Sequence, residues 1–222
     1  MQLFNSSTKL LTRNGTGKKA AREPQGLQFL LTHVRSDIAR RGGGSVIAFT
    51  SANQGEGVSH VVHFFAEKLA TQTGRRTAVV QASALSDLQV ADFMKMPGRF
   101  AQTSIPNLWL LEKKASDEVV RTPSNKEKLW REDLEWGLDP LQALTVNFTY
   151  TLIDCPSLGA SYEAEMLAPD VDGVVLVVQA DRTRRDQIMR AKRTIEMANG
   201  KLMAMVLNKR RRVVPEWIYR RL

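Results

Sequence analysis

Cysteine and long apolar runs are nearly absent from this sequence. Cys155 is the only cysteine among 222 residues, so a disulfide within the chain is excluded and a reducing compartment such as the cytosol is favoured. No apolar run reaches the roughly 18 residues of a membrane-spanning helix, and residues 1–25 contain no run typical of a signal peptide. We therefore expect a cytoplasmic protein whose contact with any membrane is peripheral.

Acidic residues are fewer than basic ones. The chain has 32 Lys and Arg against 23 Asp and Glu, which gives a formal net charge of +9. This excess favours anionic partners such as phosphates, acidic lipid headgroups, nucleic acid or an acidic protein face. Outside the C-terminal tail, no aromatic residues are interleaved with the basic ones, so nucleic acid is the least favoured of these partners.

The hydrophobic pattern predicts one α/β domain. We expect a flexible basic tail over residues 1–25 and a single domain over residues 26–222 that ends in a second basic tail. Short apolar runs alternate with amphipathic segments, which is typical of a doubly wound, mainly parallel sheet flanked by helices. Strands are expected at 45–51, 76–82, 107–111, 149–154, 173–180 and 202–208, and helices at 27–40, 58–72 and 183–198. The remainder of residues 86–145 receives no assignment.

A glycine-rich turn joins the first expected strand to the next helix. Gly55 and Gly57 fall in the turn, and Ser59 lies at the start of the helix. In a phosphate-binding loop, backbone N–H groups hold the phosphates, a lysine reaches the outer phosphates, and a serine or threonine holds magnesium. Val58 occupies the lysine position here, and His60 follows the serine. The turn therefore resembles a phosphate-binding loop that lacks its lysine.

Four stretches of the sequence, taken in order, resemble one protein family. They are SVIAFTSANQGEGVSHVVHFFAEKLATQTGRRTAVV (45–80), FTYTLIDCP (148–156), DGVVLVVQADRTRRDQIMRAKRTIE (172–196) and MAMVLNKRRRVVPEWIYRRL (203–222). Together they are similar to the CpsD/CapB-like bacterial tyrosine autokinases, whose loop reads Ser-x-x-Pro-Gly-Glu-Gly-Lys-Ser-Thr. The resemblance implies a P-loop NTPase-like fold of the deviant Walker class.

The resemblance also implies ligands and partners. Family members bind ATP and magnesium, phosphorylate tyrosines near their own C-termini, assemble into rings, and work with a membrane polysaccharide co-polymerase. Carried over to this chain, the positions at the nucleotide are Gly55, Glu56, Gly57, Val58, Ser59, His60 and Asn208. Magnesium would bind Ser59 and Asp154, the Walker B carboxylate. We expect ATP or ADP with magnesium, or no cofactor at all, and a location at the inner membrane through such a partner.

Groups that phosphoryl transfer needs are missing. Val58 replaces the loop lysine, and Gln81 and Ser83 stand where the family has the two carboxylates of an Asp-x-Asp motif. Loss of one well-placed electrostatic group commonly lowers a rate by about 10²–10³-fold. We therefore expect no fast phosphoryl transfer, assign no catalytic residue, and interpret Asp154 as a vestigial Walker B carboxylate.

Positions used for assembly and autophosphorylation also differ. The family's Glu-x-x-Arg-x-x-Arg ring contact corresponds to Gln25, Gln28 and Leu31 here, which weakens the expectation of a ring-like homo-oligomer. Only Tyr219 remains near the C-terminus in place of a tyrosine cluster, which makes it a minor candidate phosphoacceptor.

The preferred hypothesis is a pseudokinase-like regulator of exopolysaccharide or capsule synthesis that acts through a membrane co-polymerase or a kinase partner. The first alternative is a divergent ATP-dependent tyrosine kinase, in which Arg75, Arg76 or a neighbouring subunit replaces the missing lysine. The second alternative is a deviant P-loop positioning or nucleic-acid-binding protein, which only the basic charge supports.

Several single residues allow two interpretations. Asp154 belongs to a retained magnesium site or is a strand-end carboxylate satisfied by backbone N–H groups, and Ser59 favours the former. Asn208 contacts an adenine edge or satisfies backbone groups in a turn. His60 and His63 are interpreted as ordinary helix residues, because no third metal ligand is evident.

The remaining candidates are one thiol and two basic segments. Cys155 is expected to be a buried, inert thiol, because no base accompanies it. The basic residues of 182–193 are expected to form a solvated helix face. The run 209–212 and Arg220–Arg221 surround the apolar stretch 217–219, which suits an anionic membrane surface or partner groove, or a tail packed on the domain.

Overall fold

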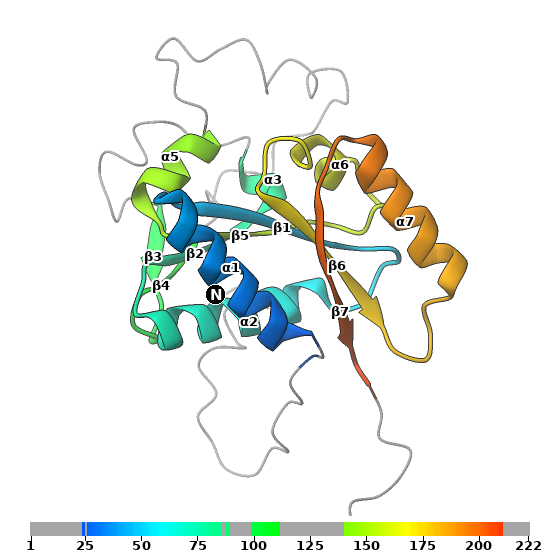
Figure 1. Cartoon of the computed structure of the whole chain (residues 1–222), viewed down its shortest axis with the longest axis horizontal. Coiled ribbons are helices and arrows are strands. Elements are labelled where there is room, and N and C mark those ends of the chain that lie inside the picture. Colours follow the sequence, from blue (N-terminus) through cyan, green and yellow to red (C-terminus); the bar gives the residue numbers. More distant parts are fainter. Residues whose placement is uncertain (1–23, 25, 86–87, 89–98, 112–139, 211–222) are drawn as a thin grey trace, which may run out of the picture.

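A computed structural model of the chain describes residues 24, 26–85, 88, 99–111 and 140–210. Its centre is a seven-stranded sheet in the order β3-β4-β2-β5-β1-β6-β7 (Figure 1). The strands are β1 (Ser45–Ser51), β2 (Thr77–Gln81), β3 (Phe100–Gln102), β4 (Leu108–Leu111), β5 (Tyr150–Asp154), β6 (Gly173–Gln179) and β7 (Leu202–Asn208). All neighbours are parallel except β3 and β4. The predicted mainly parallel sheet is confirmed, and each of the six predicted strands is present.

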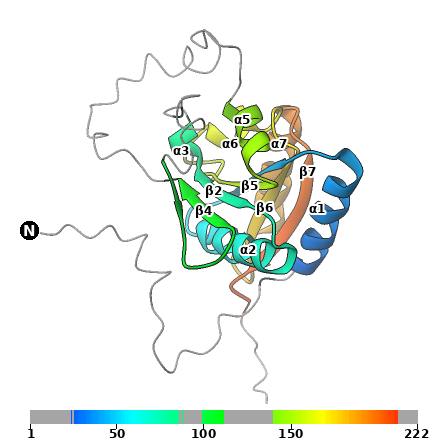
Figure 2. The same ribbon diagram turned by 90° about the vertical axis from the view of Figure 1, so that its left-hand side faces the viewer.

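Two helices cover one face of the sheet, α1 (Leu27–Arg41) and α2 (Val58–Thr73) (Figure 2). Their apolar residues recur at helical spacing and pack with strand residues such as Ile47 and Phe49 in one core cluster. Both helices end at a glycine in the left-handed conformation, Gly42 and Gly74, whose N–H groups bond to the carbonyls of Ile38 and Ala70. No described helix has the length and apolarity that crossing a membrane requires.

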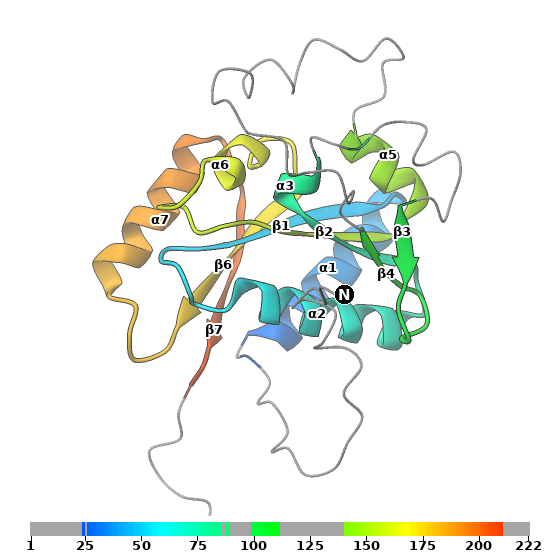
Figure 3. The same cartoon turned by 180° about the vertical axis from the view of Figure 1, so that it is seen from behind.

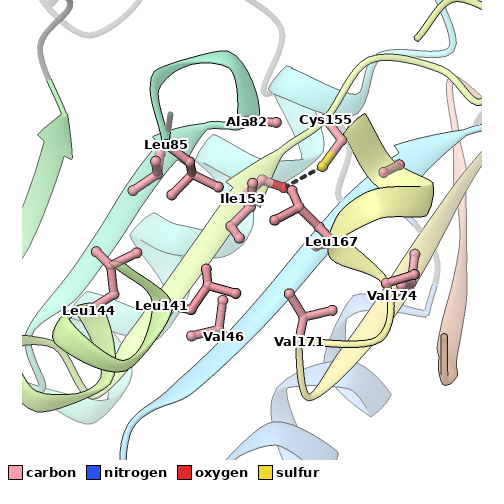
Figure 4. Packing of buried hydrophobic residues seen from close by; sticks show 14 of the residues in the cluster. Val46, Ala82, Leu85, Leu141, Leu144, Ile153, Cys155, Leu167, Val171 and Val174 are labelled. Atoms are coloured by element: carbon pink, nitrogen blue, oxygen red, sulfur yellow. Dashed lines mark hydrogen bonds between the residues drawn. The ribbon is translucent and has the colours of Figure 1, made fainter. Parts of the chain in front are cut away.

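The opposite face is covered by α3 (Ala82–Leu85), α5 (Pro140–Asn147), α6 (Glu163–Leu167) and α7 (Arg185–Met197). Figure 4 shows Leu141 and Leu144 of α5 and Leu167 of α6 packed on Val46 and Ile153 of the sheet. The central strands are therefore buried on both faces, which explains why they appear in the sequence as continuous apolar runs.

The sequence did not predict α3, β3, α5 and α6. Each has at most eight residues, too few for a clear hydrophobic period to emerge. The antiparallel β3 lies at the sheet edge and pairs through only three residues, Phe100–Gln102. The predicted tails, residues 1–25 apart from Pro24 and residues 211–222, lie outside the described part of the chain, as do residues 112–139.

The parallel strands define two different ends of the sheet. In the register of the ladder, Phe49 of β1 and Gln81 of β2 both lie beside Asp154, the last residue of β5. The carboxyl ends of these strands therefore meet at one end of the sheet, where parallel sheets generally bind ligands. We call this the carboxyl end, and the opposite end, where the strands begin, the amino end.

Candidate functional site

The turn between β1 and α2 lies at the carboxyl end. Gly55 and Gly57 have φ values of 82° and 92°, in the left-handed region that glycine enters without steric cost. Helix α2 begins directly afterwards at Val58, and no side chain caps its first turn, which contains no acidic residue. Its first amide groups are thus left without a side-chain acceptor, and the helix dipole favours an anion beside them.

Asn208 at the end of β7 fixes the second half of the loop. Its Nδ2 donates to the backbone carbonyl of Glu56 at 2.9 Å, and its Oδ1 accepts from the Lys209 N–H at 2.9 Å. A Cβ on Gly57 would lie 2.5 Å from this same Nδ2. These contacts correspond to the interpretation in which Asn208 satisfies backbone groups, and a contact with adenine stays a prediction.

Replacing Gly57 with alanine should destabilise the fold by about 2–3 kcal/mol, because the new methyl group meets Asn208 and φ is positive. Gly55→Ala is the matched control. It has a similar φ of 82°, but nothing lies within 4 Å of its Cβ, so about 1 kcal/mol is expected. Urea unfolding measures both, and equal losses would contradict the close contact with Asn208.

The Glu56 side chain ties the loop to the turn before α7. Glu56 is 3% exposed. Its carboxylate accepts hydrogen bonds from the Ala52 N–H at 3.2 Å, from Asn53 Nδ2 at 2.9 Å and from the Thr183 hydroxyl at 2.5 Å. Gln187 Nε2 donates to Asn53 Oδ1 at 3.0 Å and adds a second tie. The carboxylate is thus used within the protein, and only the backbone of Glu56 remains for the predicted contact with nucleotide.

A cleft of about 530 Å³ opens beside the loop, and we call it the loop cleft. Residues that line it include Gly55, Gly57, Val58, Ser59 and Asp154. The structure therefore brings together most of the predicted nucleotide and magnesium positions. Three predicted positions, Glu56, His60 and Asn208, are not in its lining, and His60 is exposed on α2.

Asp154 and Ser59 contact each other in this cleft. The Ser59 hydroxyl is hydrogen-bonded to the Asp154 carboxyl, which is a contact that lowers the pKa of that carboxyl. Burial has the larger effect, however, so the pKa of Asp154 is raised, while His63 nearby opposes this rise. The desolvated carboxylate therefore lacks a full counter-charge, which is the electrostatic condition that a divalent cation would relieve.

We expect Asp154→Asn to stabilise the protein in the absence of magnesium. The pKa of Asp154 is higher in the folded state than its unfolded value of about 3.9, so ionisation of this carboxyl destabilises the folded protein. The destabilisation grows as the pH rises from the unfolded pKa through the folded pKa. The gain in unfolding free energy should be on the order of 1 kcal/mol at pH 7 and shrink toward zero near pH 4. Urea unfolding at both pH values measures it. A less stable variant at pH 7 would show that the carboxylate is instead satisfied within the fold.

Gln81 and Ser83 also line the loop cleft. The positions that the resemblance assigns to the missing carboxylates thus do face the same space as Ser59 and Asp154. Glu163, in the first turn of α6, lines the cleft too. Its Oε2 is buried and has no hydrogen-bond partner among the described residues. Sequence reasoning missed Glu163 because α6 is short and was not predicted.

Lys209 contacts the loop with its positively charged side chain. Its Nζ donates to the carbonyl of Gly55 at 2.5 Å, and its Cε would lie 3.4 Å from a Cβ on Gly57. Arg75 and Arg76, which the sequence suggested as replacements for the loop lysine, lie at the amino end just before β2. That suggestion is therefore wrong for contacts within one chain, because the residues that precede a parallel strand cannot reach its far end.

The remaining single-residue predictions concern the two histidines of α2 and the cysteine after β5. The described residues contain no group of three or more His, Cys, Asp or Glu that could hold a metal, and the interpretation of His60 and His63 as ordinary helix residues stays a prediction. Burial lowers the pKa of His63. Cys155 is 2% exposed, and burial raises the pKa of its thiol, so the predicted buried thiol is confirmed.

The positions that correspond to the family's ring contact lie on or before α1. Leu31, which corresponds to the last arginine of the family's ring contact, is buried in the core at 2% exposure, whereas Gln28 is exposed and Gln25 lies outside the described residues. Leu31 therefore has no means of contacting a neighbouring subunit.

On α7, exposed ion pairs join Arg190 to Asp186 and Lys192 to Glu196, as expected for a solvated helix face.

The chain is 26% identical over 181 residues to tyrosine-protein kinase CpsD of Streptococcus agalactiae, which covers 74% of this chain and 75% of that protein. The chain is related to the CpsD tyrosine-protein kinases. The same identity holds for CpsD of a serotype III strain of that species. No protein-family model matches the chain.

Solved structures show the same fold. The kinase domain of Escherichia coli tyrosine kinase ETK matches with a TM-score of 0.62 at 13% identity over 96% of this chain and 89% of that one. The chimerical protein CapA2B2 matches with 0.60 at 21% identity over 82% and 84%. The septum site-determining protein MinD of Pyrococcus horikoshii, solved with Mg-ADP, matches with 0.51 at 16% identity over 73% and 69%. The predicted P-loop NTPase-like fold is confirmed.

Proposed function

We propose that this chain is a catalytically impaired relative of the tyrosine kinases that regulates exopolysaccharide or capsule synthesis through a membrane partner. Its nucleotide site is proposed to act as a switch that binds ATP or ADP with magnesium without fast phosphoryl transfer. The sequence similarity to CpsD supports a role in polysaccharide synthesis. The polysaccharide co-polymerase implied by the sequence resemblance is the proposed partner.

The observation that carries the proposal is the composition of the loop cleft. Ser59 and Asp154, the residue types that hold magnesium, line the same space as Val58, Gln81 and Ser83. The last three replace groups that would stabilise the transferring phosphoryl group and activate the acceptor. The cleft thus retains the groups that would bind magnesium and lacks the groups that would promote phosphoryl transfer.

The turn between β1 and α2 and the turn after β7 support binding of a nucleoside diphosphate. Uncapped amides at the start of α2 suit the phosphate closest to the loop. Lys209 contacts the loop at Gly55 but is not in the lining of the cleft, so it leaves the place of the loop lysine uncharged. Because that lysine would contact the outer phosphates, ATP is expected to bind no more than about threefold more tightly than ADP, a difference of less than 1 kcal/mol.

Magnesium is proposed to bind Ser59 and Asp154, with Glu163 as a second carboxylate facing the site. The buried and unpartnered Oε2 of Glu163 supports this role, because a buried polar atom without a partner is costly unless a ligand or water satisfies it. Magnesium typically uses one or two carboxylates together with phosphate oxygens. The ion would neutralise charge on the phosphates of a bound nucleotide.

Glu163→Gln should raise the magnesium concentration needed for half-maximal ADP binding by about 10-fold, as is typical for groups that support a metal site. Glu165→Gln is the matched control. Glu165 is two residues away and also has a buried, unpartnered Oε2, but it is not in the lining of the cleft. Fluorescent ADP titrated at several magnesium concentrations measures the effect. An equal change in both variants would remove Glu163 from the site.

The regulatory role is tested in membranes. The tagged full chain, recovered from membranes of its own cells, should bring down polysaccharide-synthesis proteins. In the presence of those membranes, it should transfer no radiolabelled phosphate from ATP to protein tyrosine. If no such proteins are recovered, the proposed role in polysaccharide synthesis is wrong. If protein tyrosine is labelled and Asp154→Ala abolishes the labelling, the proposed catalytic impairment is wrong.

A divergent kinase is the second candidate. Lys209 at the loop and Glu163 in the cleft favour it, because they are a cation and a carboxylate near the positions where the family's own are missing. In that case the tyrosine labelling described above should be present and should fall at least about 10²-fold in Lys209→Met or Glu163→Gln. Absence of labelling in the wild type would exclude this candidate, and labelling that survives both substitutions would show that Lys209 and Glu163 are not its catalytic groups.

A further inference from the structure

A second, larger cleft lies at the amino end of the sheet, remote from the loop. It measures about 780 Å³ and lies where α1, α2 and α5 end and β1 and β5 begin, and we call it the amino-end cleft. Figure 3 shows the two regions at opposite ends of the sheet, with the β1–α2 loop on one side and α5 on the other. The function proposed above makes no use of this cleft.

Three arginines, Arg35, Arg75 and Arg76, line this cleft, and none of its described lining residues is acidic. Arg76 lies over the rings of Trp109 and Phe148, at 5.5 and 5.4 Å, which orients its guanidinium. Arg35 and Arg75 both act electrostatically on the hydroxyl of Tyr150 and oppose the rise that burial causes in its pKa. Their positive charges therefore converge on one region of the cleft.

The simplest other explanation is that the arginines complement three helix carboxyl ends, which carry partial negative charge. Those ends are already closed by backbone bonds, from the N–H groups of Gly42, Gly74 and Phe148 to the carbonyls of Ile38, Ala70 and Leu144 respectively. Within the described part of the chain, no guanidinium of the three arginines donates to a carbonyl or forms an ion pair. Their N–H donors therefore remain available to a ligand.

Backbone donors lie beside these arginines. The N–H groups of Gly43 and Gly44 form no hydrogen bond to the described residues, and both glycines line the cleft. The aromatic lining residues Phe148 and Tyr150 are only 1% and 3% exposed, so no ring is available on which a nucleobase could stack. Several arginines with amide donors and no stacking platform match the oxygens of a phosphate group rather than a nucleoside.

We propose that the amino-end cleft binds the phosphate group of a small phosphorylated ligand, separately from the nucleotide at the loop. Arg35 and Arg75 would hold the phosphate oxygens, with the amides of Gly43 and Gly44 as further donors. The same chemistry is offered by a soluble sugar phosphate and by the headgroup of an anionic lipid, and the experiment separates these two sources.

The test uses the full chain labelled with nitrogen-15 and titrated with inorganic pyrophosphate. The amide signals of Gly43 and Gly44 should shift and saturate in the wild type. In the double variant Arg35→Gln/Arg75→Gln, the dissociation constant for pyrophosphate measured from these signals should rise at least about 10-fold. The reason is that each substitution removes a charge-assisted hydrogen bond, and one such bond changes a dissociation constant by about 10-fold. The signals of Gly55 and Gly57 report the loop in the same experiment, so failure at one site is distinguishable from failure at the other.

Arg185→Gln/Arg193→Gln on α7 is the matched control for the removal of two charges. Both of its arginines are exposed and lie outside the cleft. A parallel arm measures sedimentation with phosphatidylglycerol and phosphatidylcholine vesicles. Binding to the anionic vesicles alone, abolished only in the cleft variant, assigns the phosphate to a lipid headgroup. The proposal would be overturned if the signals of Gly43 and Gly44 did not respond to pyrophosphate and the cleft variant sedimented with vesicles as the wild type does. It would also be overturned if these signals responded equally in the cleft variant.

Discussion

Replacing Val58 with lysine should raise the affinity for magnesium-ATP by about 10- to 100-fold, and the affinity for ADP by less. Val58 lines the loop cleft directly after Gly57, at the position from which a loop lysine reaches the outer phosphates. A charge-assisted contact of this kind is worth about 1.5–3 kcal/mol. Isothermal titration calorimetry of ATP and ADP measures the change in each dissociation constant.

Met197→Lys is the matched control for Val58→Lys. Met197 is 85% exposed on α7, far from the loop, and the substitution adds the same charge. The Val58→Lys variant should still transfer no phosphate, because Gln81 and Ser83 supply no carboxylate. Equal affinities in the wild type and in Val58→Lys would mean that no outer phosphate lies beside this position, which contradicts the proposed orientation of the nucleotide.

Glu56→Ala should lower the free energy of unfolding by about 2–4 kcal/mol. The substitution removes the acceptor of three hydrogen bonds and leaves donors of Ala52, Asn53 and Thr183 without a partner at a site that is 3% exposed. The loop would also lose its tie to the turn before α7, so binding of ADP should weaken. Urea unfolding measures the first effect and calorimetry the second.

Glu67→Ala on the exposed side of α2 is the control for Glu56→Ala, and a change within about 0.5 kcal/mol is expected there. Glu56→Gln adds a second comparison, because it keeps the size of the side chain and part of its capacity to accept hydrogen bonds. A Glu56→Ala variant as stable as the control would show that the loop holds its shape without this carboxylate.

The sheet could be predicted because its strands are buried on both faces. Segments such as β1 and β6 contain continuous apolar runs, residues 46–49 and 174–178, and the helices between them show a helical period. The loop could be predicted because Gly55, Gly57 and Ser59 have a fixed spacing between a strand and a helix. Local pattern was therefore sufficient wherever the chemistry lies within one short stretch.

The remaining parts of the site depend on contacts between distant residues. Lys209 reaches Gly55, and Thr183 reaches Glu56, across sequence separations of 154 and 127 residues. Nothing in the sequence near either residue indicates that partner. The pairing of β7 with β6 and of β6 with β1 creates these contacts, so they followed only from the strand order. Glu163 was missed because the five-residue helix α6 has no clear hydrophobic period, and tertiary packing alone brings α6 to the loop cleft.

Whether the loop cleft still binds nucleotide is measured by calorimetric titration of ADP and ATP, with and without magnesium, into the purified full chain. Ser59→Ala and Asp154→Ala are the comparison variants. We expect micromolar, magnesium-dependent binding of both nucleotides with similar affinity, abolished in both variants. Absence of binding at millimolar nucleotide, or binding that neither variant changes, would contradict a retained nucleotide site at this loop.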